Sequence, residues 1–472
     1  MQKLKIQDKI LYFIVIFMSF FVNLVLPIGK VGLPVSIVLL WSAILLNLIF
    51  KRNIVIKYLK HFVFSGKTNL KYMLYFFIYT VILLTVFSLI GYIGFFRGLT
   101  TVFGGIFLQI FGGLLFGSFI IYKGFSVKRL IKYLYICFYT ILVIGLIDFA
   151  VCYFKIKPLM NAVYMLANER FFYDKGGVLI RHYIGNIVRV KSIFVEPADF
   201  GYFICLILPF VYGFVTSKYT FFRNFYLNKF LKITFLPLAV FNLILTQSPI
   251  YLIFGFTELI FLSLKQIIKL IVKYNIILLI LMLTAFVMLS IFNVQYDISG
   301  TFMNRILKTF GSIGNLDEFV IAEGSLATRL INYYNTLCVW LKHPFFGVGP
   351  GELNNQIYIQ TLNSSIPLTE EILIKLKRET YTYNTTFFYK YLAETGITGI
   401  MFLYYFFYKI YKHLSVNIKI LIPSVYKDFY LSIRNFMIVY VILTFYSYGY
   451  LNLYIWVLIG IALGLCYTKK LD

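Results

Sequence analysis

Charged residues are scarce in this chain, and acidic residues are the scarcest of them. Only 13% of the 472 residues are charged and 18 are Asp or Glu, whereas 61% are hydrophobic and 20% are aromatic. Soluble domains contain about 25% charged and about 45 to 50% apolar residues. The composition therefore excludes a soluble enzyme and is typical of helices that lie in a lipid bilayer.

Signatures of several other protein classes are also missing. The five cysteines form no Cys-x-x-Cys pair, so neither a disulfide framework nor a thiolate metal site is indicated. The short basic loops lack a nucleotide-binding glycine pattern, and the long segments lack Asp-x-Asp, so we expect no nucleotide donor, no cofactor and no metal. The net charge of +26 would suggest nucleic acid in a soluble protein, but membrane topology explains it here, and no nucleic-acid partner is expected.

Long apolar runs predict an all-α polytopic membrane protein with about twelve transmembrane helices, because a crossing helix needs about 20 mainly apolar residues. The expected spans are residues 10–29, 32–50, 72–92, 99–122, 131–153, 197–217, 233–247, 249–264, 274–293, 384–408, 431–448 and 450–468. The Thr-Gln-Ser-Pro sequence at 246–249 is turn chemistry inside apolar sequence, so the short seventh and eighth spans have a re-entrant element as their alternative.

Glycines recur on one side of the fourth expected span. They are Gly104, Gly105, Gly112, Gly113 and Gly117. Small residues on one face let two membrane helices approach closely. We therefore expect these glycines to form a helix contact rather than a site.

The basic residues predict the orientation of the chain. Most of the 44 Lys and Arg residues lie before the first span, after the last one and in the short loops on that same side. Cytoplasmic loops carry such an excess. Both termini are therefore expected in the cytoplasm, and residues 1–472 are interpreted as a single integral membrane domain.

Two outer segments, residues 154–196 and 294–383, are far longer than a connection between two helices requires. Function is therefore expected in these loops. The second loop has helical signals of its own: one helix is expected from Ser325 to His343, where Pro344 ends it, and another begins at Thr369.

The first candidate site is the stretch from residue 189 to residue 203, at the entry of the sixth span. Glu196 and Pro197 form an acceptable helix start, so one interpretation is a capped transmembrane helix with an arginine at the headgroups. In the functional interpretation, Arg189 and Lys191 bind phosphate and Glu196 takes a proton from a hydroxyl. This second interpretation requires the side chains to converge.

The second candidate site spans residues 325–351. Arg329 is the only charged residue of its helix before Lys342, and Gly347 and Gly349 allow a loop to cradle a diphosphate or a sugar. The alternative is an arginine that snorkels from a surface helix, followed by a glycine turn.

The third candidate site lies at the mouth of the tenth span. Tyr383 and Asn384 are placed at the membrane interface, and Glu394 follows ten residues later, about 15 Å along a helix. A carboxylate inside the membrane is a functional hypothesis. Its alternative is a hydrogen bond between packed helices, beside Gly396 and Gly399.

Taken in this order, the three stretches resemble the bacterial O-antigen polymerase and ligase superfamily. Its members carry R-x-x-S/G-x-F-x-x-P before one span, an arginine helix followed by P-x-x-G-x-G, and H-N-x-x-L ahead of E-x-G-x-x-G. The matching residues here are Arg189, Ser192, Phe194 and Pro197, then Arg329, Pro344, Gly347 and Gly349, then Tyr383, Asn384, Glu394, Gly396 and Gly399. The Phe-x-Glu-Pro sequence around Glu196 is more similar to the polymerases.

This resemblance implies an inverting, metal-independent glycosyltransferase of the bacterial cytoplasmic (inner) membrane, with its active site on the outer face. The implied donor is a glycan on undecaprenyl diphosphate, the acceptor is a lipid-linked repeat unit, and the product is a surface polysaccharide of O-antigen or capsule type. Chain-length regulator and flippase proteins are implied as partners beside the lipid bilayer. The implied catalytic residues are Arg189, Arg329, Glu196 and Tyr383, and the implied substrate-binding residues are Lys191, His343, Gly347, Gly349, Asn384 and Glu394.

One position departs from the ligase pattern. Ligases carry a histidine where this chain has Tyr383, and a tyrosine with a pKa of about 10 is a poor base at neutral pH. His182 and His343 are the outer-side histidines that could replace it. We therefore favour the polymerase, with a ligase-type transferase, a polysaccharide flippase or other transporter, and a non-catalytic scaffold as the alternatives.

Overall fold

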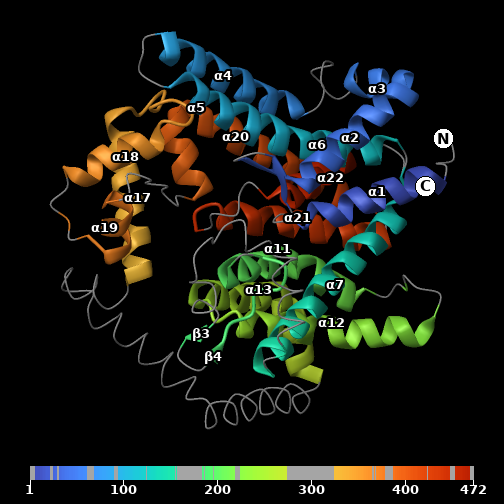
Figure 1. Ribbon diagram of the computed structural model, residues 1–472. Helices are drawn as coiled ribbons and strands as arrows, with labels where there is room; N and C mark the ends of the chain where they lie inside the picture. The colour runs from blue at the N-terminus through green and yellow to red at the C-terminus, as the bar shows by residue number, and fades with distance from the viewer. Residues whose placement is uncertain are drawn as a thin grey trace.

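The computed structural model of this chain is a bundle of helices with two short hairpins (Figure 1). It describes residues 6–21, 25–28, 31–60, 69–89, 94–123, 125–154, 156, 183–184, 187–194, 196–217, 220, 224–273, 324–363, 366, 368–377, 386–421, 424–446 and 452–467. Apart from the hairpins, the helical fold class expected from the composition is confirmed.

The first part of the chain supplies the elements from α1 to β4. They are α1 (Ile6–Ser19), β1 (Val25–Ile28), β2 (Val31–Pro34), α2 (Val35–Phe50), α3 (Arg52–Leu59), α4 (Leu70–Leu89), α5 (Phe95–Leu99), the π-helix η2 (Thr100–Phe111), α6 (Gly112–Tyr122), α7 (Val127–Tyr153), β3 (Tyr183–Ile184) and β4 (Ile187–Val188). The second part supplies α11 (Pro197–Thr216), α12 (Phe225–Leu245), α13 (Pro249–Lys273), α17 (Gly324–Lys342), α18 (Leu353–Leu362), α19 (Glu370–Lys377), α20 (Phe387–Ile420), α21 (Val425–Leu443) and α22 (Leu453–Tyr467).

Five helices of the described residues are long and apolar enough to cross a membrane. They are α4, the continuous run from α5 through η2 to α6, α7, α11 and α12, and the pair α2 and α3 makes a sixth if its 110° bend lies within one span. These helices identify a multi-pass membrane protein. Twelve spans and the orientation of the termini stay predictions, and the ninth expected span lies outside the described residues.

The first expected span is shorter than predicted. Helix α1 ends at Ser19, and the chain then forms an antiparallel hairpin in which Val25 pairs with Pro34 and Ile28 with Val31. Pro27 lies in β1, and proline removes a helical hydrogen bond and clashes with the preceding turn. The expectation of a helix to residue 29 was therefore wrong.

The seventh expected span is longer than predicted. Helix α12 begins at Phe225 and has 21 residues, so it is long enough to cross a membrane. The turn expected at 246–249 is confirmed, and Gln247 in it has a positive φ of 47°.

The tightest helix contact joins α6 to α22. A Cβ atom at Gly117 would lie 2.3 Å from the carbonyl oxygen of Val457, and one at Gly113 would lie 2.7 Å from the Cβ of Trp456. The close contact expected from the glycines is thus confirmed for this half of the run. It is wrong for Gly104, where a Cβ would meet no atom within 4 Å.

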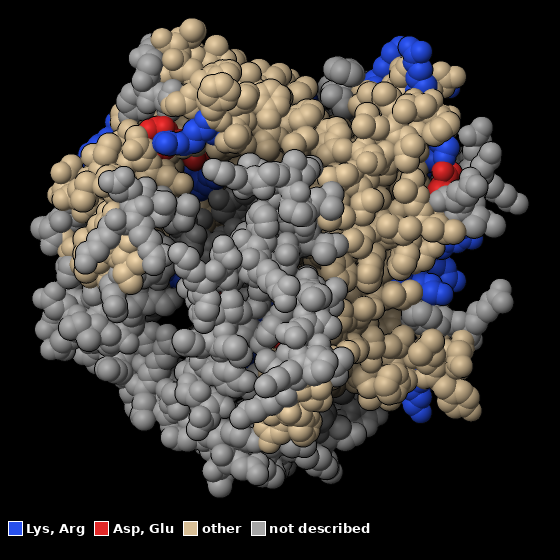
Figure 2. All heavy atoms as spheres, viewed as in Figure 1, with Lys and Arg blue, Asp and Glu red and all other residues tan. Residues whose placement is uncertain are grey.

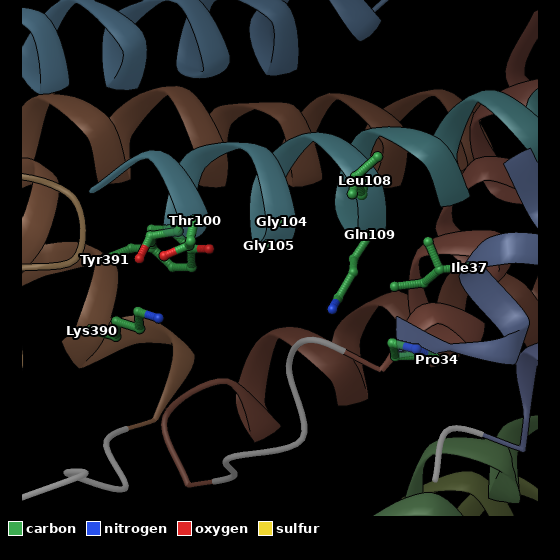
Figure 3. A pocket seen from close by; sticks show the side chains of 10 residues that line it. Pro34, Ile37, Thr100, Gly104, Gly105, Leu108, Gln109, Lys390 and Tyr391 are labelled. Atoms are coloured by element: carbon green, nitrogen blue, oxygen red, sulfur yellow. The ribbon is translucent and has the colours of Figure 1, made fainter. Parts of the chain in front are cut away.

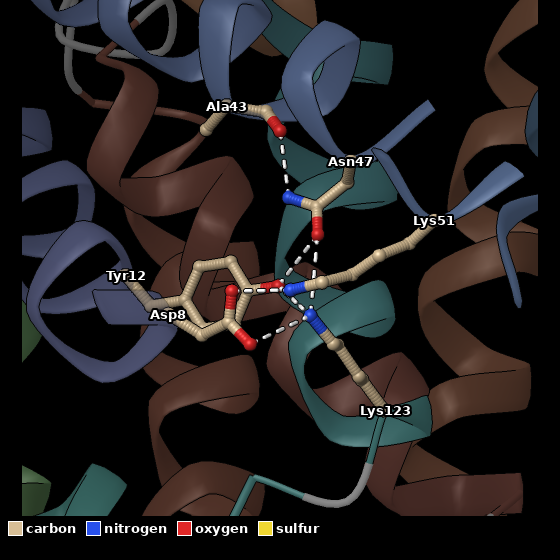
Figure 4. A network of polar contacts seen from close by, with 6 residues as sticks. All are labelled: Asp8, Tyr12, Ala43, Asn47, Lys51 and Lys123. Atoms are coloured by element: carbon tan, nitrogen blue, oxygen red, sulfur yellow. Dashed lines mark hydrogen bonds and ion pairs between the residues drawn. The ribbon is translucent and has the colours of Figure 1, made fainter. Parts of the chain in front are cut away.

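Basic side chains gather on one edge of the bundle, over α1, α3 and the end of α6 (Figure 2). There the carboxylate of Asp8 forms ion pairs with Lys51 and Lys123, and the Lys123 ammonium also donates to the Tyr12 hydroxyl at 2.8 Å and to Asn47 at 3.2 Å (Figure 4). Burial lowers the pKa of Lys123 to about 8, although Asp8 opposes the shift. This network fastens α1 to the ends of α2 and α6.

The second long loop forms three helices at the opposite end of the bundle (Figure 1). Helix α17 ends at Lys342, as Pro344 predicts, and α19 begins at Glu370, where the Thr369 hydroxyl accepts a hydrogen bond from the amide of Ile372 at 3.3 Å. Both expected helices are confirmed. Helix α18, between them, was not expected.

Candidate functional site

Residues 189–194 form a buried strap between α7 and α11. The Asp148 carboxylate, on α7, accepts hydrogen bonds from the amides of Lys191 and Ser192, at 2.9 and 3.1 Å. Ser192 has a positive φ of 55°, and its hydroxyl donates to the carbonyl of Ile141 at 2.8 Å. Phe194 stacks on Phe200 of α11, with ring centroids 5.7 Å apart. Asp148 therefore holds in place the stretch that carries the first motif.

The two basic side chains of this strap have different surroundings. Arg189 donates from Nε to the carbonyl of Thr246, at 3.2 Å, and so joins the strap to the turn between α12 and α13. Lys191 is fully buried. Burial lowers the pKa of its ammonium to about 8, and the nearby charge of Asp148 opposes this shift. Their roles in binding phosphate stay predictions.

Arg329 lies near the start of α11. The guanidinium interacts favourably with the carboxylate of Asp199, which the carboxylate of Glu196 repels. Glu196 is the N-cap residue of α11 and Pro197 its first residue, but the exposed Glu196 side chain does not cap the helix. Asp199, three residues after Glu196, thus links the second candidate site to the first, because the charges of Arg329 and Glu196 both act on its carboxylate.

The glycine loop of the second motif docks onto a kink in α20. Gly396 has φ 67° and ψ −173°, and the kink diverts the amide of Ile397 to the carbonyl of Pro344, at 2.9 Å. The carbonyls of Ala393 and Glu394 are thereby left for the loop, and they accept the amides of Val348 and Gly349 at 2.8 and 3.0 Å.

Glu394 and the glycines complete this contact. The Glu394 carboxylate accepts the amide of Gly351 at 3.1 Å, so the second and third motifs meet directly. Gly347 has φ 71°, and a Cβ there would lie 2.5 Å from the carbonyl oxygen of Ala393. Close backbone approach is therefore one reason for these glycines. Glu394 does form a hydrogen bond, but its partner is the glycine loop and not a packed helix, as the alternative interpretation had expected.

This docking bears on the predicted substrate-binding residues. The amide of Gly349 donates to Glu394, and that of Gly347 donates to the carbonyl of the half-buried His343, at 2.9 Å. A cradle for phosphate would have to use other donors. Substrate binding by Gly347, Gly349, His343 and Glu394 stays a prediction, while Tyr383, Asn384 and His182 lie outside the described residues.

An aromatic stack joins α17, the helix that carries Arg329, to α20, the helix that carries Glu394. The rings of Tyr333 on α17 and Tyr389 on α20 are 4.9 Å apart and nearly parallel, at 19°. Tyr333 lies one turn after Arg329, and Tyr389 lies five residues before Glu394. The stack therefore holds α17, the helix of Arg329, against the start of α20.

Among the described residues, no group of three His, Cys, Asp or Glu side chains could hold a metal ion. Residues 234–404 match the family model Wzy_C, described as O-antigen ligase. This match confirms the resemblance to the O-antigen polymerase and ligase superfamily. It includes the second half of α12, α13, α17 to α19 and the first half of α20, and excludes the strap. No curated protein matches the chain.

Proposed function

We propose, from the match of residues 234–404 to the O-antigen ligase family, that the protein is a glycan transferase of the polymerase type. It transfers a glycan from undecaprenyl diphosphate to a lipid-linked repeat unit at the outer face of the cytoplasmic membrane. The favourable interaction between the charge of Arg329 and the Asp199 carboxylate carries this proposal, because it brings a diphosphate-binding group within electrostatic range of a candidate base.

Arg329, Asp199 and Glu196 suit the two groups that an inverting transfer must handle, the leaving diphosphate and the acceptor hydroxyl. The acceptor hydroxyl attacks the anomeric carbon, the bond from that carbon to the diphosphate breaks, and the diphosphate leaves with the bonding electrons. Arg329 suits the departing group because a guanidinium holds two phosphate oxygens at once. Glu196 or Asp199 suits the base that takes the hydroxyl proton.

Two residue choices favour a polymerase over a ligase. The Phe-x-Glu-Pro sequence around Glu196 is more similar to polymerases, and Tyr383 stands where ligases use a histidine. A ligase-type transferase is the second candidate, because the matching family model is described as O-antigen ligase. Purified single repeat units on the lipid carrier distinguish the two: a polymerase makes a ladder of longer chains from them alone, whereas a ligase needs a different acceptor.

Arg329→Lys tests the role of the guanidinium. The change keeps the positive charge and removes the fork, so we expect transfer to slow by roughly 10²-fold or more, as for lost oxyanion contacts elsewhere. The amount of folded protein in the membrane should not change. Rates are measured in liposomes with lipid-linked repeat units.

Arg97→Lys is the matched control. Arg97 is 58% exposed, and the lysine keeps the positive charge that faces the buried Glu352 carboxylate at 3.6 Å. Its transfer rate should stay close to that of the wild type. Equal rates in the Arg97→Lys and Arg329→Lys variants would rule out diphosphate stabilisation by Arg329.

A further inference from the structure

A pocket of about 350 Å³ lies beside the docked glycine loop, between η2, α20 and the junction of β2 with α2 (Figure 3). This size falls in the range of about 300 to 1,000 Å³ typical of small-ligand pockets. Gln109 of η2 and Lys390 of α20 point into it, and Ile37 and Leu108 supply an apolar wall. The pocket thus combines polar side chains with an apolar surface.

The polar groups of the pocket fall into donors and acceptors. The hydroxyls of Thr100 and Thr101 both donate to the carbonyl of Arg97, at 2.8 and 3.2 Å, so their oxygens can only accept from a ligand. The Lys390 ammonium and the Gln109 amide nitrogen can only donate. A suitable ligand must therefore supply hydrogen-bond donors as well as acceptors.

This requirement separates two classes of ligand. An ionised phosphate offers only acceptors, so it can accept from Lys390 and Gln109 but forms no hydrogen bond with the two threonine oxygens. A sugar ring carries hydroxyls that both donate and accept, and its C–H faces suit the Ile37 and Leu108 wall. None of the described residues that line the pocket is acidic.

Two contacts place the pocket next to Glu394 and the docked glycine loop. Lys390 lies one turn before Glu394 on α20, and its charge acts on the Glu394 carboxylate. Thr101 approaches the glycine loop, because a Cβ at Gly351 would lie 2.9 Å from its hydroxyl oxygen. The pocket therefore lies beside the docked glycine loop, at the start of α20, and α20 also packs against the Arg329 helix through the Tyr333–Tyr389 stack.

Helix η2 forms one wall of the pocket, and two of its residues on this wall are glycines. A π-helix is rare and is frequently found at functional sites, and here it has 12 residues. Gly104 and Gly105 lie on its pocket side, and a Cβ at Gly104 would meet no atom within 4 Å. The same helix run thus uses Gly113 and Gly117 for packing and Gly104 for open space.

We propose that this pocket binds a sugar ring of the acceptor glycan. The ring hydroxyls donate to Thr100 and Thr101 and accept from Gln109 and Lys390. This inference rests on the proposed transferase function, with the donor diphosphate at Arg329 and the acceptor sugar in the pocket at the start of α20.

Gly104→Leu tests the inference because Gly104 lines the pocket and a Cβ there meets no protein atom within 4 Å, so the new side chain takes up pocket space. Gly94→Leu is the matched control: a Cβ there also meets nothing within 4 Å, and Gly94 does not line the pocket. Binding to purified protein in detergent is measured for two probes, the free repeat-unit oligosaccharide and undecaprenyl phosphate without sugar. We expect Gly104→Leu to weaken oligosaccharide binding at least tenfold and to leave undecaprenyl phosphate binding unchanged.

Gln109→Leu and Thr101→Val provide a second route should Gly104→Leu fail to fold. Each removes one ligand contact at nearly constant size, so oligosaccharide binding should weaken about 2- to 12-fold, as expected for one lost hydrogen bond. In transfer assays with a fluorescent short-chain lipid-linked repeat unit as acceptor, the acceptor KM should rise while kcat stays near normal.

The outcomes separate this inference from the proposed function. Wild-type oligosaccharide binding by all pocket variants, or loss of undecaprenyl phosphate binding instead, would overturn the sugar pocket even in an active transferase. Failure of the wild type to transfer glycan, together with oligosaccharide binding that Gly104→Leu abolishes, would overturn the transferase and leave the sugar site standing.

Discussion

Replacing Asp148 should destabilise the protein by an amount that follows from two hydrogen bonds. In Asp148→Ala, the buried amides of Lys191 and Ser192 lose their acceptor. An unsatisfied buried donor costs about 1 to 3 kcal/mol, so the loss should be about 2 to 6 kcal/mol. Asp148→Asn keeps one oxygen in reach of both amides and weakens each bond from a charged to a neutral one, at a cost of about 1 kcal/mol each.

Thermal unfolding in detergent, followed by the amount of monodisperse protein, measures this difference. We expect the order wild type, Asp148→Asn, Asp148→Ala, and a fall in transfer rate in the same order, because the strap carries Arg189. Asp428→Asn on α21 is the control, since Asp428 is only half-buried and lies far along the chain from the strap. An Asp148→Ala variant as stable as Asp148→Asn would show that these two hydrogen bonds do not hold the strap.

Two further predictions concern the kink and the buried lysine. Gly396→Ala should strongly reduce folded protein, measured as the melting temperature in detergent, because its Cβ would lie 2.2 Å from the carbonyl oxygen of Phe345 in a backbone conformation with φ 67°; an unchanged melting temperature would contradict the docked loop. If the Lys191 charge supports transfer, the rate should fall as pH rises through about 8, where this ammonium loses its proton, and Lys191→Arg should remove that alkaline limb. The pKa of Lys191 in the folded protein lies below the value of 10.5 for an exposed lysine. The free-energy cost of burying its charge is therefore present in full below pH 8 and disappears between pH 8 and 10.5. The contribution of this group to the free energy of unfolding should thus rise with pH in that window.

The sequence by itself determined the features that depend on neighbouring residues. Apolar runs identified a helical membrane protein, Pro344 ended α17, Thr369 began α19, and the turn at 246–249 separated α12 from α13. Each of these signals acts over about one turn of backbone, through a missing amide, a capping hydroxyl or a run of apolar side chains. Such effects can be read without knowing what lies across the bundle.

The tertiary structure alone decided which distant residues meet. The role of Asp148 depends on the amides of Lys191 and Ser192, more than 40 positions away, and nothing near Asp148 in the sequence identifies them. No sequence pattern identified the amide of Gly351 as the hydrogen-bond donor to Glu394 either. Gly104 and Gly117 look alike in the sequence, yet one faces a pocket and the other a carbonyl oxygen of α22. The physical reason is that a side chain's role depends on the atoms packed against it, and helix packing brings these from segments with no local relation in the chain.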